Sequence, residues 1–494
     1  MEALQFWLDG LRVATTPTNL LFALIGSLLG TVIGVLPGIG PAAGTAILIP
    51  LTFKLDPIPA IIMLSAIYYG AMYGGTITSV LVNVPGEATS VITCLDGYQM
   101  AKRGRAGAAL GISAIGSFIG GTVATVALMV VALPLASLAL TFGPPEVFAL
   151  LVVGLSLATS LAGRSMLAAL LMMCFGLLLA LVGMDPVRGA PRFSFGFAAL
   201  YDGVGFIPVA MGLYGIGEIL LSVERPYQEI IRTKLSSLLP TREEWRRSVG
   251  PIGRGTVLGF FLGLIPGVGA VIPTFVAYIL EKRVSKHPER FGTGAIEGVA
   301  APETANNAYA TGAMVPLLAL GIPGSPTLAV LMGAFTINGI TPGPLLFREH
   351  PDLVWGVIAS FYVGNIFLII LNLPLVGLWA KLLEVPYQYL YAGVLLFCIV
   401  GAYSTRQSIF DVGLMMLFGV LGYVFRKLDW PLAPAVLALI LGPMLEQTLR
   451  TSLEMSGGDL GIFVTRPITA AFLILAAVIL AGSAMRAMPL RKLA

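Results

Sequence analysis

The chain has 494 residues, of which 57% are hydrophobic and only 11% are charged. Soluble domains carry about a quarter charged residues, so this composition excludes an ordinary soluble protein and indicates a chain embedded in a membrane. The formal net charge of +4 then reports the orientation of loops, and we expect the lipid bilayer, and no nucleic acid, as a partner.

The N-terminal segment MEALQFWLDGLRV has acidic residues where a cleavable signal peptide has a basic region. No small-residue cleavage site follows, so we expect the segment to be retained. Three cysteines, far apart along the chain, lack the spacing of a metal or redox site and are expected to be packed in the interior.

Apolar segments close to the roughly 20 residues that cross a bilayer recur along the whole chain. Some are too short to span and one could hold two passes, so we predict about 10 to 13 membrane segments in an all-α polytopic membrane protein. The candidate segments are residues 18–36, 58–81, 108–140, 146–162, 165–183, 205–221, 255–280, 296–320, 353–380, 390–402, 411–425, 429–449 and 466–485.

One long polar segment divides the chain into two halves. Residues 223–254 carry seven Lys or Arg against four Glu, and this excess of basic residues predicts a cytoplasmic linker. The predicted parts are a first transmembrane repeat at 1–221, the linker at 222–254, a second repeat with further C-terminal spans at 255–485, and a basic tail at 486–494.

Two motifs occur once in each half and in the same order. LPGIG at 36–40 matches IPGVG at 265–269, and NVPGEAT at 83–89 matches GIPGSPT at 321–327. The two offsets, 229 and 238 residues, are similar. Matched motifs in one order predict an internal duplication.

The loops between the motifs predict that the two repeats are inverted. The loop at 281–290 has four basic residues, whereas its first-half counterpart at 54–57 has one Lys and one Asp. Conversely, the first-half loop at 102–105 is basic and its counterpart near 339–352 is not. Matched loops thus change sides of the membrane. Inverted repeats are the architecture of many secondary transporters, whose substrate site lies at the repeat interface.

Each motif places Pro and Gly inside an apolar run. In hydrocarbon every backbone N–H and C=O needs an internal partner, and Pro and Gly together free several of them. A single break of this kind fits a kink packed against a neighbouring helix. Four breaks that are paired across two repeats favour broken or re-entrant helices that line a watery cavity.

Polar side chains surround these breaks, above all the second break of each half. Ser and Thr also join membrane helices to one another, so Thr76, Thr78 and Ser79 fit either a helix interface or a binding site. Carboxylates and adjacent amides inside a membrane cost more and are functional candidates. The candidate substrate- or ion-binding residues are Thr78, Ser79, Asn83, Glu87, Thr89, Glu303, Asn306, Asn307 and Ser325, with Gly267 and Gly269 in the first break of the second half.

Three blocks of the sequence resemble a known family. GVLPGIGP, YGGTITSVLVNVPGEATSVITCLDGYQMAKRGRAGAAL and EGVAAPETANNAYATGAMVPLLALGIPGSPT look like the signature blocks of the large membrane subunit of tripartite tricarboxylate transporters, the TctA family. The blocks lie between residues 18 and 344 in the family's order, and the likeness continues by hydropathy to the end of the chain.

The resemblance implies a permease of the bacterial inner membrane that imports carboxylates with the help of an ion gradient. Such a permease works with a small four-helix membrane subunit, TctB-like, and with a periplasmic solute-binding receptor, TctC-like. The second-half break lacks the proline that closes the first-half motif, so the pseudo-symmetry is imperfect. The motif positions carried over are Pro37, Gly38, Gly40, Asn83, Pro85, Gly86, Glu87, Asp96, Gly97, Glu303, Asn306, Asn307, Pro323, Gly324 and Ser325.

An organic acid bound at these motifs needs a counter-charge, yet the signature blocks contain Lys or Arg only at 102–105. A helix N-terminus contributes about 0.3 to 1 kcal/mol, whereas moving a carboxylate out of water costs several kcal/mol. We therefore expect a coupling cation and no other cofactor or resident metal: Na⁺ on backbone carbonyls and Asn, Thr or Ser oxygens, or H⁺ on Glu87 or Glu303. Asp96 is expected to cap a helix or, alternatively, to couple an ion.

Other classes of function are less well supported by the residues. We expect no enzyme, because the two histidines, His287 and His350, lie in polar loops and none is near the serine of GIPGSP. No GxxxxGK[ST] phosphate loop is present, which argues against an ATP-driven pump. A passive anion channel and a carboxylate carrier that needs no receptor remain as alternatives.

Overall fold

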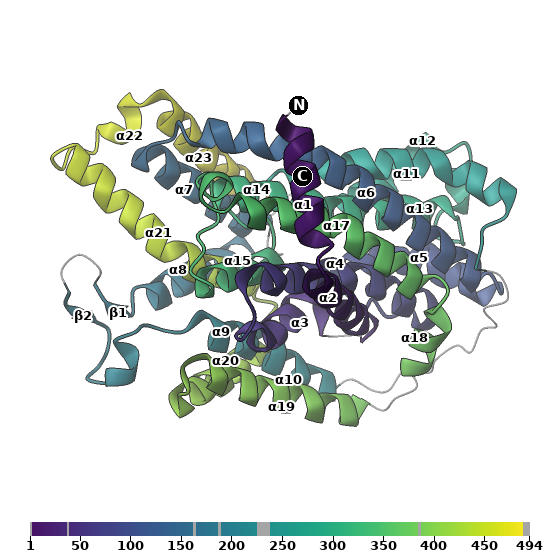
Figure 1. Cartoon of the computed structure of the whole chain (residues 1–494), viewed down its shortest axis with the longest axis horizontal. Coiled ribbons are helices and arrows are strands. Elements are labelled where there is room, and N and C mark those ends of the chain that lie inside the picture. The colour runs from purple at the N-terminus through teal and green to yellow at the C-terminus, as the bar shows by residue number, and fades with distance from the viewer. Residues whose placement is uncertain are drawn as a thin grey trace, which may run out of the picture.

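Figure 1 shows the structure, a computed structural model that describes residues 2–36, 39–161, 165–185, 189–224, 238–383 and 387–487. Helices make up nearly all of the regular structure in these ranges. The two strands found there, β1 (Gly183–Met184) and β2 (Pro191–Arg192), pair antiparallel in a small hairpin. The prediction of an all-α polytopic membrane protein is confirmed.

The first half contains ten α-helices in the described ranges, with four short helical turns between or within them. The α-helices are α1 (Glu2–Ala14), α2 (Pro17–Val35), α3 (Gly40–Leu48), α4 (Pro57–Val82), α5 (Val91–Lys102), α6 (Ala106–Ala139), α7 (Pro144–Leu161), α8 (Met166–Ala180), α9 (Phe206–Ala210) and α10 (Gly217–Val223). The short turns are η1 (Ile49–Thr52), η2 (Ala88–Ser90), η3 (Ala198–Leu200) and the π-helical η4 (Met211–Ile216), which joins α9 to α10.

The second half begins after the linker and is likewise helical in the described residues. Its described helices are α11 (Arg242–Gly263), α12 (Val271–Val284), η5 (Pro288–Arg290), α13 (Glu297–Gly312), α14 (Met314–Leu320), α15 (Pro326–Ile337), α16 (Leu346–Glu349), α17 (Pro351–Asn372), α18 (Val376–Leu382), α19 (Tyr387–Arg406), α20 (Ile409–Lys427), α21 (Ala433–Met455), α22 (Ile462–Thr465) and α23 (Pro467–Ala487).

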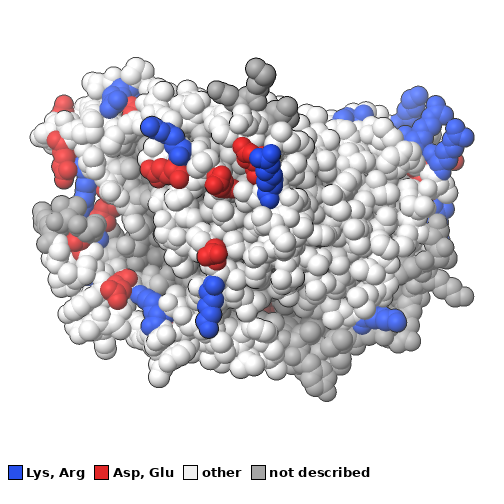
Figure 2. All heavy atoms as spheres, viewed as in Figure 1, with Lys and Arg blue, Asp and Glu red and all other residues white. Residues whose placement is uncertain are grey.

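Within the described residues, five helices are long and apolar enough to cross a membrane, namely α2, α4, α6, α17 and α20. Further apolar helices are shorter, and two of them, α3 and α15, begin directly after a break. The chain is therefore a multi-pass membrane protein, whereas the number of 10 to 13 segments stays a prediction. In Figure 2 a broad strip without charged side chains separates the charged left part of the surface from the basic group at the right end of the view.

The two halves repeat one order of elements around their breaks. In the first half this order is α2, a break, α3, the long α4, a second break, α5 and the long α6; in the second it is α11, a break, α12, α13 with α14, a second break, α15 and α17. The inverted orientation of the halves stays a prediction. Basic residues Lys282 and Arg283 lie in the last turn of α12, a helix that packs against α5, α11 and α13.

Small residues allow the central helices to approach closely. A Cβ added to Gly30 on α2 would lie 2.5 Å from the Ile67 carbonyl oxygen on α4, and one added to Gly255 on α11 would lie 2.6 Å from the Ala301 carbonyl oxygen on α13. Glycine at these places lets the backbones touch, as in many membrane helix pairs. The second-half helix α13 also packs against the first-half helices α4, α5 and α6, so the halves interlock around it.

Candidate functional site

The second break of the first half follows the end of α4. Asn83 has a left-handed backbone (φ 58°), which terminates the helix, and Glu87 begins η2 with its backbone N–H directed at the Ser90 hydroxyl. A Cβ added to Gly86 would clash with the Gly34 carbonyl oxygen on α2 and would lie 2.6 Å from Thr78 Oγ1 on α4. The break therefore requires glycine at this position because it is pressed against α4.

The second break of the second half has the same backbone plan. Gly321, 238 positions after Asn83, is also left-handed (φ 69°) and terminates α14. Ser325, 238 positions after Glu87, caps α15 by accepting a hydrogen bond from the Leu328 N–H at 3.3 Å. The paired motifs thus produce paired turns, as the sequence predicted for broken helices.

The first breaks of the two halves also share a conformation. Gly40 (φ 67°) and Gly269 (φ 71°), which are 229 positions apart, are both left-handed. Pro37 and Gly38 lie outside the described residues. The Tyr309 hydroxyl donates a hydrogen bond to the Gly324 carbonyl oxygen at 3.0 Å and lies beside the Gly269 backbone N–H. One side chain thereby joins the two breaks of the second half.

Glu87 lies where the first-half break meets α13 of the second half. It is 5% exposed, and its Oε1 accepts hydrogen bonds from the Thr89 hydroxyl and from Asn306 Nδ2, the latter at 2.9 Å. Among the described residues, Glu87 Oε2 and Asn306 Oδ1 are buried and have no hydrogen-bond partner. Gly75 on α4 leaves room for this side chain, since an added Cβ would lie 2.7 Å from Glu87 Cγ.

Glu303 lies on the same helix as Asn306, one turn earlier, and is 1% exposed. Its Oε2 accepts a hydrogen bond from the Thr76 hydroxyl at 2.5 Å, and its Oε1 accepts one from the Thr93 hydroxyl. Ser113 Oγ lies 3.3 Å from Oε2 and 3.2 Å from Thr76 Oγ1. Three first-half helices, α4, α5 and α6, therefore supply hydroxyls to one second-half carboxyl group.

Asn307 ties α13 to α6 rather than to a break. Its Nδ2 donates to Ser117 Oγ at 2.7 Å, and Ser117 Oγ donates to the Glu303 carbonyl oxygen at 3.2 Å. The cavity beside Thr76 and Ser113 has a volume of about 10 Å³, roughly one water molecule. This part of the site is closed in the described conformation.

The structure brings some of the predicted residues together and leaves others apart. Those that meet at the contact of the halves are Glu87, Thr89, Glu303, Asn306, Asn307 and Ser325, whereas Gly86 and Gly324 contact residues of their own halves. Thr78 and Ser79 donate to the Gly75 carbonyl oxygen of their own helix, so their hydroxyls are engaged within α4. A role for them in substrate or ion binding stays a prediction. Those that contribute backbone shape without a polar side chain at this contact are Gly40, Asn83, Pro85, Gly267, Gly269 and Pro323.

Several residues of the cluster were not predicted, namely Tyr68, Thr93, Ser113, Ser117 and Tyr309. The register of the repeat could have identified one of them, because Tyr68 precedes Asn306 by the same 238 positions that separate Glu87 from Ser325. Tyr68 lies near both Ser325 and Glu87. Asn306 and Tyr68 thus occupy matched positions, each against the break of the other half.

Asp96 on α5 binds the loop that precedes α13. Its Oδ1 accepts hydrogen bonds from the backbone N–H groups of Gly292, Gly294 and Ala295 at 2.9, 2.7 and 2.7 Å, and its Oδ2 accepts one from the Tyr278 hydroxyl at 2.8 Å. The side chain is fully buried. This geometry matches the capping alternative, but the capped segment belongs to the other half of the chain.

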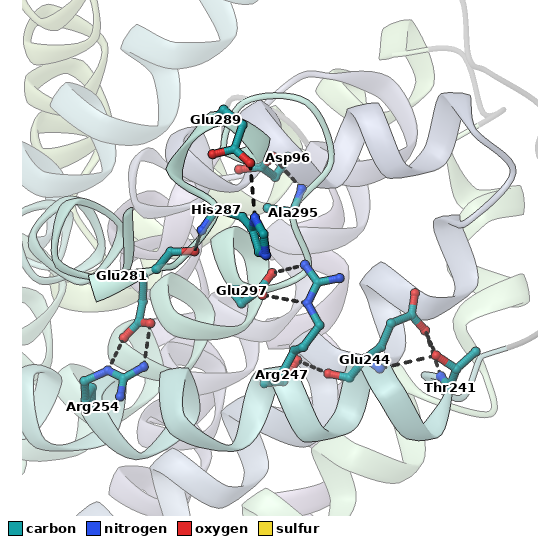
Figure 3. A network of polar contacts seen from close by, with 12 residues as sticks. Asp96, Thr241, Glu244, Arg247, Arg254, Glu281, His287, Glu289, Ala295 and Glu297 are labelled. Carbon is teal, nitrogen blue, oxygen red and sulfur yellow. Dashed lines mark hydrogen bonds and ion pairs between the residues drawn. The ribbon is translucent and has the colours of Figure 1, made fainter. Parts of the chain in front are cut away.

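Two bidentate ion pairs flank this loop, as Figure 3 shows beside Asp96. Arg247 on α11 binds Glu297 at the start of α13 with two contacts of 2.8 Å, and Arg254 binds Glu281 on α12 at 2.6 and 2.8 Å. Bidentate pairs of this kind fix the orientation of both side chains. Arg247–Glu297 and Asp96 hold the start of α13 in place, and Arg254–Glu281 joins α11 to α12.

A pocket of about 700 Å³ lies at the C-terminal end of α15, next to the β1–β2 hairpin. Arg192 and Arg406 are among its lining residues. Both are paired with carboxylates, Arg192 with Glu446 at 2.6 Å and Arg406 with Asp411 at 2.6 Å. In this conformation the pocket therefore presents arginines whose charges are already compensated.

Comparisons with known proteins agree with this architecture. The chain matches the model of the tripartite tricarboxylate transporter TctA family over residues 20–437. It is 48% identical over 465 residues to a protein of Agrobacterium vitis, described as an uncharacterized 52.8 kDa protein in the TAR-I ttuC' 3' region, and the match covers 94% of this chain and 93% of that protein.

A second Agrobacterium vitis protein, described as an uncharacterized protein in the TAR-II ttuC' 3' region, is 48% identical over 215 residues, which are 44% of this chain and 89% of that protein. No solved structure matches the chain. The family indicated by the sequence blocks is confirmed, because the model match extends over most of the chain. The chain belongs to the tripartite tricarboxylate transporter TctA family and is thus a component of a transporter rather than an enzyme.

Proposed function

We propose that the chain is the permease subunit of a receptor-dependent secondary transporter that imports tricarboxylates, dicarboxylates or related organic acids. The observation that carries the proposal is the convergence of broken helices from both halves on two buried carboxyl groups, Glu87 and Glu303. Buried acids within a membrane protein are costly and are typically retained for ion or substrate pathways. Contacts between matched segments of two halves are where secondary transporters bind substrate.

The electrostatics of this contact support coupling to a cation. None of the groups that hydrogen-bond to Glu87 or Glu303 in the described ranges is a Lys or Arg. An organic acid entering the cluster would meet carboxyl groups of the same sign, and removing it from water costs several kcal/mol. Co-binding of Na⁺ or H⁺ offsets both effects and links uptake to a gradient.

The proposal includes two partner proteins, because the family is that of tripartite transporters. The small TctB-like membrane subunit would complete the membrane assembly, and the TctC-like receptor would deliver the acid from the periplasm. The bacterial inner membrane is accordingly the proposed location. The receptor would contribute much of the selectivity, so the individual acid is to be identified with the receptor present.

Reconstitution tests the proposal directly. The chain and its small membrane subunit are placed in vesicles, and uptake of a labelled acid is measured with the receptor present and absent, under an imposed Na⁺ or pH gradient. We expect accumulation above the external concentration only with receptor and gradient together. Equilibration without accumulation would identify a passive channel, and accumulation without receptor would identify a receptor-independent carrier.

A further inference from the structure

The coupling cation can be specified from the atoms around Glu87. We infer that Glu87 is the proton-binding carboxyl group of this protein, and that in this conformation it is a neutral acid joined to Asn306 by two hydrogen bonds in one ring. The role of this proton in coupling rests on the proposed function. The protonation of Glu87 itself does not.

One half of the ring is present in the structure. Asn306 Nδ2 donates to Glu87 Oε1 at 2.9 Å, and both side chains are buried, with 1% and 5% exposure. The two atoms that would form the other half, Glu87 Oε2 and Asn306 Oδ1, are buried and lack a hydrogen-bond partner among the described residues. Both are oxygens, so neither can donate to the other without an added proton.

A single proton on Oε2 satisfies both oxygens. It makes Oε2 a donor to Asn306 Oδ1, so that the carboxylic acid and the amide each donate one hydrogen bond and accept one. A carboxylate in the same place would leave two acceptors facing each other away from water, which is unfavourable. The reaction is a plain proton transfer from water to Oε2, and the same proton returns to water when the site opens.

Glu303 provides the contrast within the same cluster. Each of its oxygens already has a hydroxyl donor, Thr76 for Oε2 and Thr93 for Oε1, with Ser113 close to Oε2. Hydroxyl donors on both oxygens stabilise the ionised form of a carboxyl group. Two negative charges close together in a buried site repel each other, so the two acids are not both ionised, and the donors on Glu303 make Glu87 the acid that takes the proton first.

A sodium ion fits the same atoms less well. It requires several oxygen ligands at once, whereas Glu87 Oε2 and Asn306 Oδ1 are the two unpartnered side-chain oxygens at this contact in the described ranges. Oε1 is already engaged by two donors. One proton, by contrast, needs only Glu87 Oε2 to hold it and Asn306 Oδ1 to accept the resulting hydrogen bond.

The titratable groups around Glu87 come from every element packed against its segment. The carboxyl of Glu303 on α13 and the hydroxyl of Tyr68 on α4 act on it electrostatically. On α5 the thiol of Cys94 faces the Ser90 carbonyl oxygen and feels the charge of Glu303. On α12 the Tyr278 hydroxyl is bound to Asp96. These groups include no cation that would hold Glu87 ionised.

Infrared difference spectroscopy of the purified full chain tests the inference without a substrate. Lowering the pH should produce the C=O stretching band of a protonated carboxylic acid, which Glu87→Gln removes and the matched variant Glu303→Gln retains. Glu87→Gln should remain folded, since its amide can donate to Asn306 Oδ1 and accept from Asn306 Nδ2. A band that persists in Glu87→Gln, or that disappears only in Glu303→Gln, overturns the inference.

Transport then tests the coupling role. In vesicles with the complete system, Glu87→Gln should lower the ratio of pH-driven accumulation to equilibrium exchange at least tenfold. If the wild type accumulates acid with a Na⁺ gradient alone and shows no acid band, the inference fails although the proposed function stands. If the band behaves as expected but no organic acid is transported, the proposed function fails and the protonation of Glu87 stands.

Discussion

The two breaks at 83–87 and 321–325 have nearly the same backbone and different chemistry. Both begin with a left-handed residue, Asn83 or Gly321, and both end at the N-cap position of the next helix, which is Glu87 or Ser325. The first break ends with an acid and the second with Ser325. Asp96, nine residues after Glu87, has Ala334 at its matched position. The two breaks therefore share a backbone shape, whereas Glu87 and Asp96 have no acidic residue at their matched positions in the second half.

The largest expected effect concerns Asp96, whose matched position in the second half is Ala334. Asp96→Ala leaves three backbone N–H groups and the Tyr278 hydroxyl without an acceptor. We expect a loss of about 3 kcal/mol or more in the free energy of unfolding, because hydrogen bonds to a charged group contribute about 1.5 to 3 kcal/mol each and the losses overlap. Denaturant titration of the purified protein in detergent measures it.

The control for this variant is Tyr278→Phe, which removes one of the four hydrogen bonds to Asp96. It should cost about 1 kcal/mol. Equal losses in the two variants would show that the loop before α13 is held by other contacts, such as the Arg247–Glu297 pair, and that Asp96 does not lock the halves together.

The next effect compares the glycines of the two breaks. Gly86→Ala would press a methyl group against the Gly34 carbonyl oxygen of α2 and place it 2.6 Å from Thr78 Oγ1, whereas the nearest atoms to a methyl at Gly324 are 3.5 and 3.6 Å away. We expect Gly86→Ala to cost about 1 to 3 kcal/mol of stability, the usual range for overpacking, and Gly324→Ala to cost less than about 1 kcal/mol. Thermal unfolding in detergent compares the pair.

Both glycines stand in the same sequence context, so a difference between them would come from packing alone. Similar melting temperatures for Gly86→Ala and Gly324→Ala would contradict the asymmetric packing of the two breaks. A larger loss in Gly324→Ala would reverse the comparison.

The sequence predicts the backbone of the four breaks better than it predicts the side chains that contact the buried acids. The motif pairs predict the breaks, and the structure places left-handed residues at Asn83 and Gly321, where one motif has Asn and the other Gly. Buried carboxylates and amides are recognisable because they are rare in apolar chains. Thr93 and Ser113 are not, since hydroxyls at helix contacts have no distinguishing signal until the packing of α5 and α6 against α13 is known.

The third prediction compares Asn306, which binds Glu87 in the break of the other half, with its neighbour Asn307. Asn306→Leu keeps the volume of the side chain but removes the donor to Glu87 Oε1 and the proposed acceptor for its proton. We expect the initial rate of acid uptake into vesicles to fall at least about tenfold, which corresponds to 1.4 kcal/mol. Asn307→Leu, which instead breaks a contact to Ser117, is the neighbouring control and should reduce uptake less. An equal reduction would indicate general loss of packing.

The smallest expected effects separate two buried tyrosines, Tyr68 and Tyr309, that both lie at the break of the second half. The Tyr309 hydroxyl donates to the Gly324 carbonyl oxygen, whereas the Tyr68 hydroxyl lies beside Ser325 without the geometry of a hydrogen bond. Tyr309→Phe should therefore cost about 1 kcal/mol of stability, and Tyr68→Phe close to none, because it removes no hydrogen bond. Thermal unfolding of both variants in one detergent gives the comparison. A larger loss of stability in Tyr68→Phe than in Tyr309→Phe would contradict this expectation. It would show that the Tyr68 hydroxyl makes a stabilising contact with Glu87 or Ser325.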